Sequence, residues 1–328
     1  MMKLIFGLSI LTSPLFSQAP EMPLDWNPQN QEFRKFYGWS EAVGSWEWVK
    51  TEQGISIHIF TPQEPSPAGP KGTLFVVHGY LEHAGTQVQN IELAVLQGWL
   101  VVALDLPGHG LSEGERAAIG DFKAYAQAFS AMTTLRPWGQ PWAAMGHSTG
   151  CATIMEARQE GLHQIQKVWF TAPLVRTWMW APSMAFHPLV YTVTPTLPSR
   201  YGASSRNNEY NEFLAKDPLF IPYVPKSWVE ALSQWEKTTL LWPVSYWPIE
   251  VLQGTADTVV DANYNIPFLQ SRFQGLTVQT LEGAYHDPFH DEPQTALKSK
   301  ELFLHWLSTP DLEFQQNISH TGSYEPQS

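Results

Sequence analysis

The residues best suited to do chemistry are Gly146-His147-Ser148-Thr149-Gly150, a Gly-X-Ser-X-Gly pattern. A short apolar run precedes the pattern, and residues 152–161 have helical character, so we expect Ser148 at a sharp turn from strand to helix. Only small neighbours fit such a turn, which exposes the serine Oγ and directs a helix N-terminus at a developing oxyanion. The pattern therefore predicts a nucleophilic serine, although Ser-Gly pairs also occur in ordinary loops.

A nucleophilic serine needs a general base, and the base needs a carboxylate to orient it. Two candidates follow predicted strands: Asp257 comes after residues 249–254, and His286 comes after residues 276–281. Serine, acid and histidine then occur in the chain order expected of a doubly wound sheet with a serine nucleophile, and active sites form at the carboxyl ends of such strands. We predict a triad of Ser148, Asp257 and His286. Asp105 is the alternative acid, but it precedes the serine and is assigned a structural role.

The oxyanion that forms during acyl transfer needs two backbone N–H donors. One is expected from Thr149, directly after the nucleophile. The other is expected from Tyr80, since His78-Gly79 ends the apolar strand of residues 73–77 and lets the backbone bend. The alternative is that His78-Gly79 is an ordinary turn at the end of a strand.

Two histidines allow a second interpretation, a zinc site. His286 and His290 are four residues apart and have Asp287 and Asp291 beside them, a spacing that suits metal ligands on a helix. Pro288 interrupts any such helix, and a third ligand is not evident. We therefore expect no metal and no cofactor, with His290 as a loop-stabilising or surface residue.

The elements that position these residues are predicted to alternate between strands and helices. Apolar runs at residues 73–77, 100–104 and 168–171 alternate with helical patterns at 87–98 and 121–135, which indicates a parallel sheet wrapped by helices. A hairpin of residues 45–50 and 55–61 precedes them, after an irregular lead-in at 20–44. The expected organisation is a core of residues 45–173 and 249–307, an inserted and mainly helical lid at 174–248 with a helix at 226–237, a closing helix at 292–307, and a polar tail at 308–328.

Composition and the N-terminus limit the function further. The net charge of −12 argues against nucleic acid as a partner, and Cys151, the single cysteine, cannot form an internal disulfide. Lys3, an apolar run at 4–16 and Ser17-Gln18-Ala19 predict a signal peptide at residues 1–19. Export to the periplasm or the exterior is therefore expected, with the cytoplasm as the alternative.

Four motifs together resemble the α/β-hydrolase group of monoacylglycerol lipases, bacterial lysophospholipases and S33-type serine peptidases. They begin at His78, Asp105, Gly146 and Glu282 and read HGYLEH, DLPGHGLSEG, GHSTG and EGAYH. The resemblance runs from about residue 72 to 307 and implies an α/β-hydrolase fold, a serine esterase activity and no cofactor. The chain departs from the usual pattern of the group at four positions: Pro107, Ala128, Thr149 and Cys151.

The lid favours a lipid-like substrate, because its apolar side chains could line a groove for an acyl chain. These are Trp178, Trp180, Met184, Phe186, Leu189, Tyr191, Phe220, Tyr223 and Trp228. The alternative is that they pack the lid against the sheet.

The expected activity is hydrolysis of a single-chain acyl ester, monoacylglycerol or lysophospholipid, with transient contact to a membrane or micelle surface. A serine peptidase is the alternative, with Glu209, Glu212, Asp217 and Glu230 as lid carboxylates for a free amine. A third interpretation is a hydrolase-fold binding protein without turnover. The sequence does not determine the head group or the oligomeric state.

Overall fold

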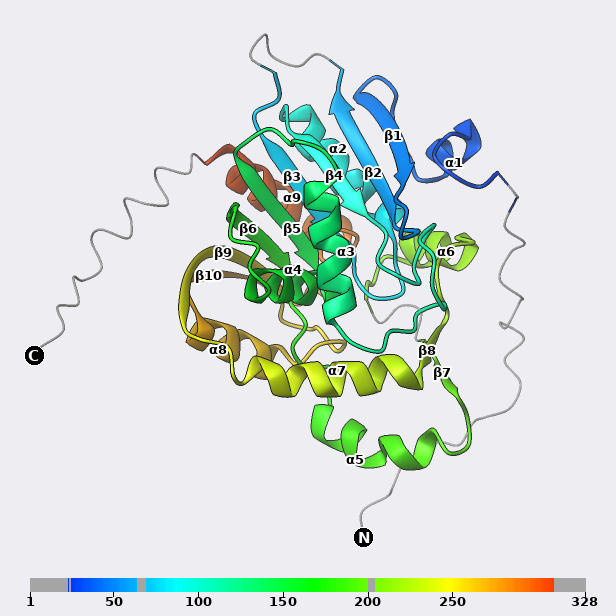
Figure 1. Ribbon diagram of the computed structural model, residues 1–328, viewed down its shortest axis with the longest axis vertical. Helices are drawn as coiled ribbons and strands as arrows, with labels where there is room; N and C mark the ends of the chain where they lie inside the picture. The colour runs from blue at the N-terminus through cyan, green and yellow to red at the C-terminus, as the bar shows by residue number, and fades with distance from the viewer. Residues whose placement is uncertain (1–22, 24, 64–68, 200–203, 310–328) are drawn as a thin grey trace, which may run out of the picture.

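An eight-stranded sheet forms the centre of the computed structural model (Figure 1). The structure describes residues 23, 25–63, 69–199 and 204–309. The strand order is β1-β2-β4-β3-β5-β6-β9-β10, in which β2 pairs antiparallel with both β1 and β4 and the remaining pairs are parallel. The strands are β1 (Gly44–Lys50), β2 (Ser56–Pro62), β3 (Thr73–Val77), β4 (Leu100–Leu104), β5 (Trp142–His147), β6 (Ile165–Thr171), β9 (Ser245–Gly254) and β10 (Phe273–Leu281). The predicted parallel sheet with an opening hairpin is confirmed.

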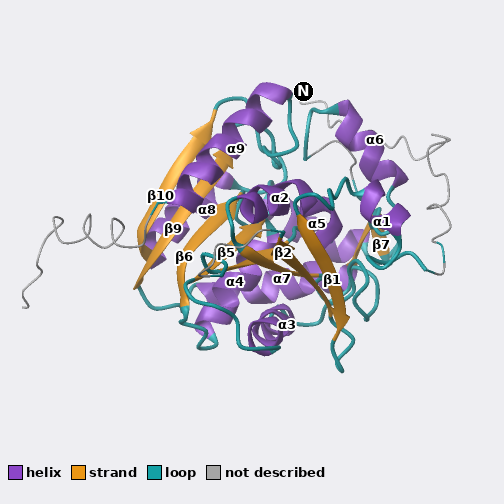
Figure 2. Cartoon of the chain, turned by 90° about the horizontal axis from the view of Figure 1, so that it is seen from above, coloured by secondary structure: helices purple, strands orange, loops and turns teal. Residues whose placement is uncertain are grey.

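Helices cover both faces of the sheet, which explains why its inner strands β3 and β4 are almost wholly apolar. All five residues of β3 are buried, with Phe75 and Val77 in one hydrophobic cluster and Leu74 and Val76 in the other. The first cluster packs under α3 (Lys123–Thr134), α4 (Thr149–Gln159), α7 (Lys226–Thr239) and α8 (Ala262–Arg272), and the second under α1 (Gln31–Phe36), α2 (Val88–Leu96) and α9 (Pro293–Ser308). Figure 2 shows α2 and α9 on one side of the sheet and α3 and α4 on the other.

Several element boundaries differ from the sequence predictions. The lead-in of residues 20–44 contains the short helix α1, whose Asn30 side chain accepts a hydrogen bond from the Glu32 amide. Helix α8 was not predicted from the sequence, since Pro267 lies inside it. Strand β9 begins at Ser245 rather than at residue 249, so the insertion ends before 245.

Helices form most of the regular secondary structure described between β6 and β9. This segment contains α5 (Trp180–Val190), α6 (Asn208–Lys216) and α7, together with a two-stranded sheet of β7 (Thr196–Pro198) and β8 (Tyr223–Pro225). A short 3-10 helix, η1 (Ala84–Gln87), precedes α2. Within the described ranges, no helix has both the length and the apolar character needed to cross a membrane. The predicted signal peptide and residues 310–328 of the predicted tail lie outside the described residues.

Candidate active site

Ser148 lies at the junction of β5 and α4, in a backbone conformation that non-glycine residues seldom adopt (φ 50°, ψ −109°). Its amide donates to the Thr171 carbonyl at 2.9 Å, and its carbonyl accepts from the Cys151 amide at 3.1 Å. Such strain persists only where surrounding structure imposes it, and it is found mainly at functional sites. The predicted sharp turn is therefore present in the structure.

The two glycines of the pattern are required by close backbone contacts. A Cβ at Gly146 would lie 2.7 Å from the Cys151 nitrogen, and a Cβ at Gly150 would lie 2.1 Å from the Val77 carbonyl oxygen. The helix α4 thus approaches β5 and β3 so closely that no side chain fits between them.

His286 and Asp257 form a hydrogen-bonded pair. The His286 Nδ1 lies 2.8 Å from the Asp257 Oδ2, and both side chains are nearly inaccessible. Burial by itself raises the pKa of Asp257, but His286 and the amides of Val259 and Val260 outweigh that effect and lower the pKa of the carboxyl below its usual value. An ionised Asp257 holds the proton of His286 on Nδ1 and leaves Nε2 as the basic nitrogen.

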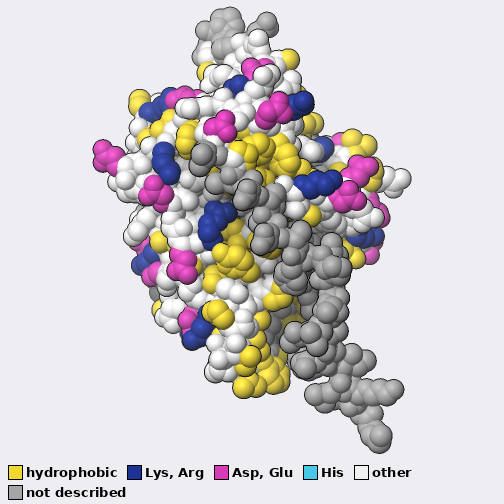
Figure 3. Space-filling view, turned by 90° about the vertical axis from the view of Figure 1, so that its right-hand side faces the viewer, with side chains coloured by type: hydrophobic (Ala, Val, Ile, Leu, Met, Phe, Trp, Pro, Cys, Tyr) yellow, Lys and Arg dark blue, Asp and Glu magenta, His cyan; other side chains and the backbone are white. Residues whose placement is uncertain are grey.

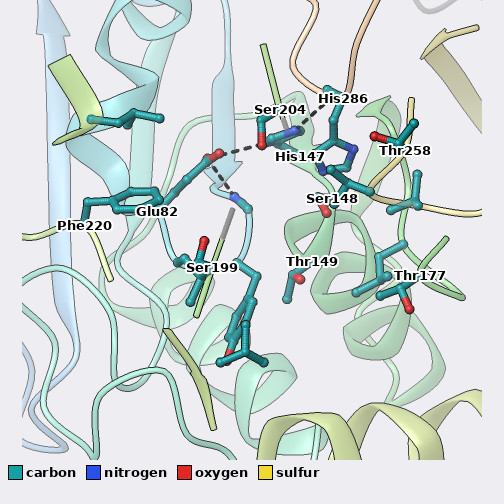
Figure 4. A pocket seen from close by; sticks show the side chains of 18 of the residues that line it. Glu82, His147, Ser148, Thr149, Thr177, Ser199, Ser204, Phe220, Thr258 and His286 are labelled. Atoms are coloured by element: carbon teal, nitrogen blue, oxygen red, sulfur yellow. Dashed lines mark hydrogen bonds and ion pairs between the residues drawn. The ribbon is translucent and has the colours of Figure 1, made fainter. Parts of the chain in front are cut away.

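A cavity of about 280 Å³ brings the predicted site residues together. Ser148, Thr149, His286 and Tyr80 all line it, and Figure 4 shows Ser148 and His286 on the same wall. Asp257 stands behind His286 and is fully buried. The structure therefore gathers all five predicted residues at one place, at the carboxyl ends of β3, β5, β9 and β10.

Two buried side chains, His78 and Asp105, stabilise the loop that carries Tyr80 through hydrogen bonds to backbone groups. His78 donates from Nδ1 to the Gly79 carbonyl and accepts at Nε2 from the Leu106 amide, so it is neutral. Burial accordingly lowers the pKa of His78 to about 4. Asp105 accepts hydrogen bonds from the amides of Ala84 and Leu111. These contacts match the structural role expected of Asp105.

The loop that carries His286 is joined to the inserted segment. The Asp287 amide donates to the Ser204 carbonyl at 2.7 Å, and the Ser205 hydroxyl donates to the His290 carbonyl at 2.7 Å. His290 is buried and its Nδ1 lies 2.7 Å from Asp287, which is a loop-stabilising contact. These residues do not lie on a helix, so the helical zinc motif considered from the sequence does not form.

The apolar side chains of the lid divide between two locations. Phe220 and Trp228 line the cavity, and the Trp228 ring stacks on Tyr80 with 3.8 Å between ring centroids. No residue of α5 is buried. Its residues Phe186 and Leu189 are 52% and 67% exposed, so the idea that they line an acyl groove is wrong for this structure.

Sequence reasoning missed the part played by His147 and Glu82. Both line the cavity, and the His147 Nδ1 lies 3.3 Å from the Glu82 Oε2. The sequence could have indicated these two residues only through their neighbours: His147 directly precedes Ser148, and Glu82 lies two residues after Tyr80. Nothing in their spacing, which is 65 residues, shows that they meet.

Comparison with known proteins agrees with this geometry. Residues 68–293 match the family model described as serine aminopeptidase, S33. The chain is 30% identical over 259 residues to the human monoglyceride lipase, covering 74% of this chain and 84% of that protein. It is 24% identical to phospholipase YtpA of Bacillus subtilis, over 71% of this chain and 95% of the relative. The crystal structure of the Paleococcus ferrophilus monoacylglycerol lipase superposes with a TM-score of 0.65 at 23% identity, covering 77% of this chain and 98% of that one.

The chain belongs to the S33 family of α/β-hydrolases. Its relatives and family identify it as a carboxylic ester hydrolase with a lipase or esterase function on this fold. The resemblance and the fold class inferred from the sequence are confirmed.

Proposed function

We propose that the protein cleaves the carboxylic ester of a single-chain acyl lipid, monoacylglycerol or lysophospholipid, through an acyl-enzyme on Ser148. The observation that carries this proposal is the strained Ser148 in a cavity that also receives the Asp257-paired His286. A serine, a base and an acid in this arrangement are the elements of nucleophilic acyl transfer.

In the proposed reaction, the Ser148 Oγ attacks the ester carbonyl while the His286 Nε2 takes its proton. Asp257 stabilises the imidazolium, and the amides of Tyr80 and Thr149 donate to the oxyanion. The C–O bond to the alcohol then breaks as His286 returns the proton to the leaving oxygen. Water then attacks the acyl-enzyme carbonyl while His286 takes its proton, and His286 returns the proton to Ser148 as the ester bond breaks. The products are a fatty acid, the alcohol and free Ser148. Apart from the attacking water, residues of this chain supply the groups that these steps use.

The size and lining of the cavity support a single acyl chain. Its volume of about 280 Å³ is at the lower end for ligand pockets. Leu174, Val224, Trp228 and Val259 give it an apolar part, whereas Ser199 and Ser204 are polar. An acyl chain fits the first group and an alcohol with hydroxyls fits the second.

The exposed apolar residues of the lid support transient contact with a membrane or micelle surface. Trp178, Leu189 and Val193 are 49%, 67% and 86% exposed, and α5 carries no acidic residue, lysine or arginine. Figure 3 shows hydrophobic side chains gathered at the lower end of the molecule, the end at which α5 lies in Figure 1. A lipid surface would cover this patch and bring substrate near the cavity.

The variants L189S and V193S test the surface contact. Both should lower co-sedimentation with phosphatidylcholine vesicles while hydrolysis of soluble p-nitrophenyl acetate stays unchanged. The matched control is L96S on α2, where Leu96 is 64% exposed but lies outside the lid. Equal vesicle binding by all four proteins would refute the contact.

The peptidase alternative lacks support in the cavity. Asp217 is buried against Tyr37 and His83, and Glu212 and Glu230 form ion pairs with Lys216 and Lys226. Among the described residues that line the cavity, Glu82 is the one carboxylate, and it is already paired with His147. A free amine would therefore find no unpaired carboxylate there.

Turnover by the wild type and the S148A variant decides among these functions. Both should be assayed on monoacylglycerol, lysophospholipid, short p-nitrophenyl esters and aminoacyl amides. We expect ester cleavage that S148A abolishes. Amide cleavage without ester cleavage would replace the proposal with a peptidase, and the absence of any Ser148-dependent turnover would favour a binding protein.

We also propose export of the protein, from the sequence of residues 1–19. Cell fractionation followed by N-terminal sequencing should find the chain outside the cytoplasm and without these residues. Cytosolic protein that still begins at Met1 would refute export.

A further inference from the structure

His147 lies between two buried carboxylates that come from separate loops. Glu82 follows β3, and Asp287 follows β10. One ligand atom of each of the three residues lies within 4.8 Å of the others, and all three are buried. A charged cluster thus stands directly beside the proposed nucleophile, and the proposed reaction gives it no role.

The contacts of His147 determine its charge. Its Nδ1 faces the Glu82 carboxylate and its Nε2 faces the His286 carbonyl, each at 3.3 Å. The carbonyl has no hydrogen to donate, and His147 lowers the pKa of Glu82 against the effect of burial, which keeps Glu82 a carboxylate. Both ring nitrogens of His147 therefore donate, and the ring is an imidazolium. Burial lowers the pKa of His147, but Glu82 and Asp287 more than compensate and raise it to about 9.

The three residues could in principle bind a metal ion, but one oxygen of each carboxylate already has hydrogen-bond partners. The Glu82 Oε2 accepts from the Gly79 amide and from the Gln87 side chain as well as from His147. The Asp287 Oδ2 is bonded to His290. A positive charge is already present on His147, so an ion pair explains the cluster.

The hydrogen bond from His147 to His286 connects the two reacting residues of the proposed site. His147 directly precedes Ser148 in the chain, and its Nε2 holds the backbone of His286. The two imidazole rings are 4.9 Å apart, centroid to centroid. Any change in the charge or position of His147 therefore acts on the distance between the serine and its base.

We propose that His147 is a positioning residue for the hydrolytic reaction: as an imidazolium held by Glu82 and Asp287, it fixes the backbone of His286 relative to Ser148. This inference rests on the proposed function, because it assigns His286 as the base. Activity then requires His147 to stay protonated. The rate should fall at high pH as His147 loses its proton, independently of the titration of the base itself.

The other titratable groups around His147 do not replace it in this role. Besides Glu82, Asp287 and His286, they are His78 below the Tyr80 loop and His290 and Tyr210 beside Asp287. His78 is neutral, and burial raises the pKa of Tyr210. His290 donates to Asp287 and stacks on Tyr210, 4.3 Å between ring centroids.

The test uses the variants H147Q and E82Q, with H163Q at an exposed histidine as the matched control. We expect H147Q to lower kcat on p-nitrophenyl butyrate by about 10- to 100-fold with KM nearly unchanged, because small displacements of reacting groups have effects of this size. In the wild type, activity should fall as the pH rises through about 9. In E82Q this decline should begin at a lower pH, since a neutral glutamine no longer stabilises the imidazolium. H163Q should match the wild type.

A second measurement separates this inference from the proposed function. A fluorophosphonate probe should phosphonylate Ser148 in the wild type, more slowly in H147Q, and at the wild-type rate in H163Q. No labelling of the wild type would refute the serine mechanism itself. Labelling of the wild type with unchanged rates and pH profiles in both variants would overturn only the role of His147.

The charge of the His147 ring can also be measured directly in the wild-type protein, without an activity assay of a variant. Nitrogen-15 NMR of the histidine side chains should show His147 protonated on both ring nitrogens at neutral pH. A neutral His147 ring in the wild type would overturn the inference even if H147Q failed to fold.

Discussion

Replacing Gly150 with alanine tests whether the close approach of α4 to β3 maintains the site. The added Cβ would lie 2.1 Å from the Val77 carbonyl oxygen and 2.8 Å from the His78 carbonyl oxygen. Real Cβ atoms stay beyond 3.0 Å from such atoms, so α4 and the end of β3 must separate by about 1 Å. Both neighbours are backbone atoms in buried elements, and neither can rotate away.

The expected cost of this separation is about 3 kcal/mol in the free energy of unfolding, at the upper end for overpacked cores. For a chain of 328 residues, that corresponds to a decrease of roughly 4–5 °C in Tm. The shift also moves Ser148, which precedes α4, away from the Tyr80 loop, which follows β3. A displacement of about 1 Å should lower kcat/KM roughly 100-fold.

Urea denaturation and hydrolysis of p-nitrophenyl butyrate measure the two effects. The control is G120A, because a Cβ at Gly120 meets no atom within 4 Å. Its free energy of unfolding should stay within about 0.5 kcal/mol of the wild type, or rise slightly because alanine restricts the unfolded chain. A G150A variant with wild-type stability and activity would refute the reasoning.

Three further predictions follow from the buried groups. D257N should lower kcat roughly 10³- to 10⁴-fold in an ester assay, because an amide cannot stabilise a protonated His286; a loss under tenfold would contradict the assigned acid. The free energy of unfolding should decline as the pH rises from about 6.5 through about 9, because folding raises the pKa of His147 and its contribution is complete only below the unfolded value. Urea titrations across this range should show a smaller decline in H147Q. Cys151 is buried and burial raises the pKa of its thiol, so a disulfide reagent should modify it only as fast as the protein unfolds, and rapid labelling of native protein would disprove that burial.

The α/β core and the meeting of the candidate site residues in one cavity could be predicted from sequence, because their signals are local. All five residues of β4 and four of the five in β3 are apolar, a pattern that requires strands covered on both faces, and Gly146 and Gly150 mark the sharp turn between β5 and α4. Asp257 and His286 each follow a strand directly. Parallel strands end at one edge of the sheet, so these residues had to meet Ser148 there.

Helices that depend on tertiary contacts gave weaker signals. Helix α8 has Pro267 in its interior, and its buried Asn265 donates to the carbonyls of Pro173 and Arg176. Those partners lie about 90 residues away, so the local sequence does not reveal them. For α5, a mainly apolar sequence suggested burial, yet the fold leaves none of its residues buried.

The sequence by itself determined the order and spacing of the proposed nucleophile, acid and base, because these depend on strand ends and on turns that accept only glycine. Only the tertiary structure decided that buried carboxylates raise the pKa of His147 and that its ring contacts the backbone of His286. The charge of a buried histidine depends on which atoms face its two nitrogens, and here those atoms come from positions 65 and 139 residues away. No local pattern records such a contact, because long-range packing alone creates it.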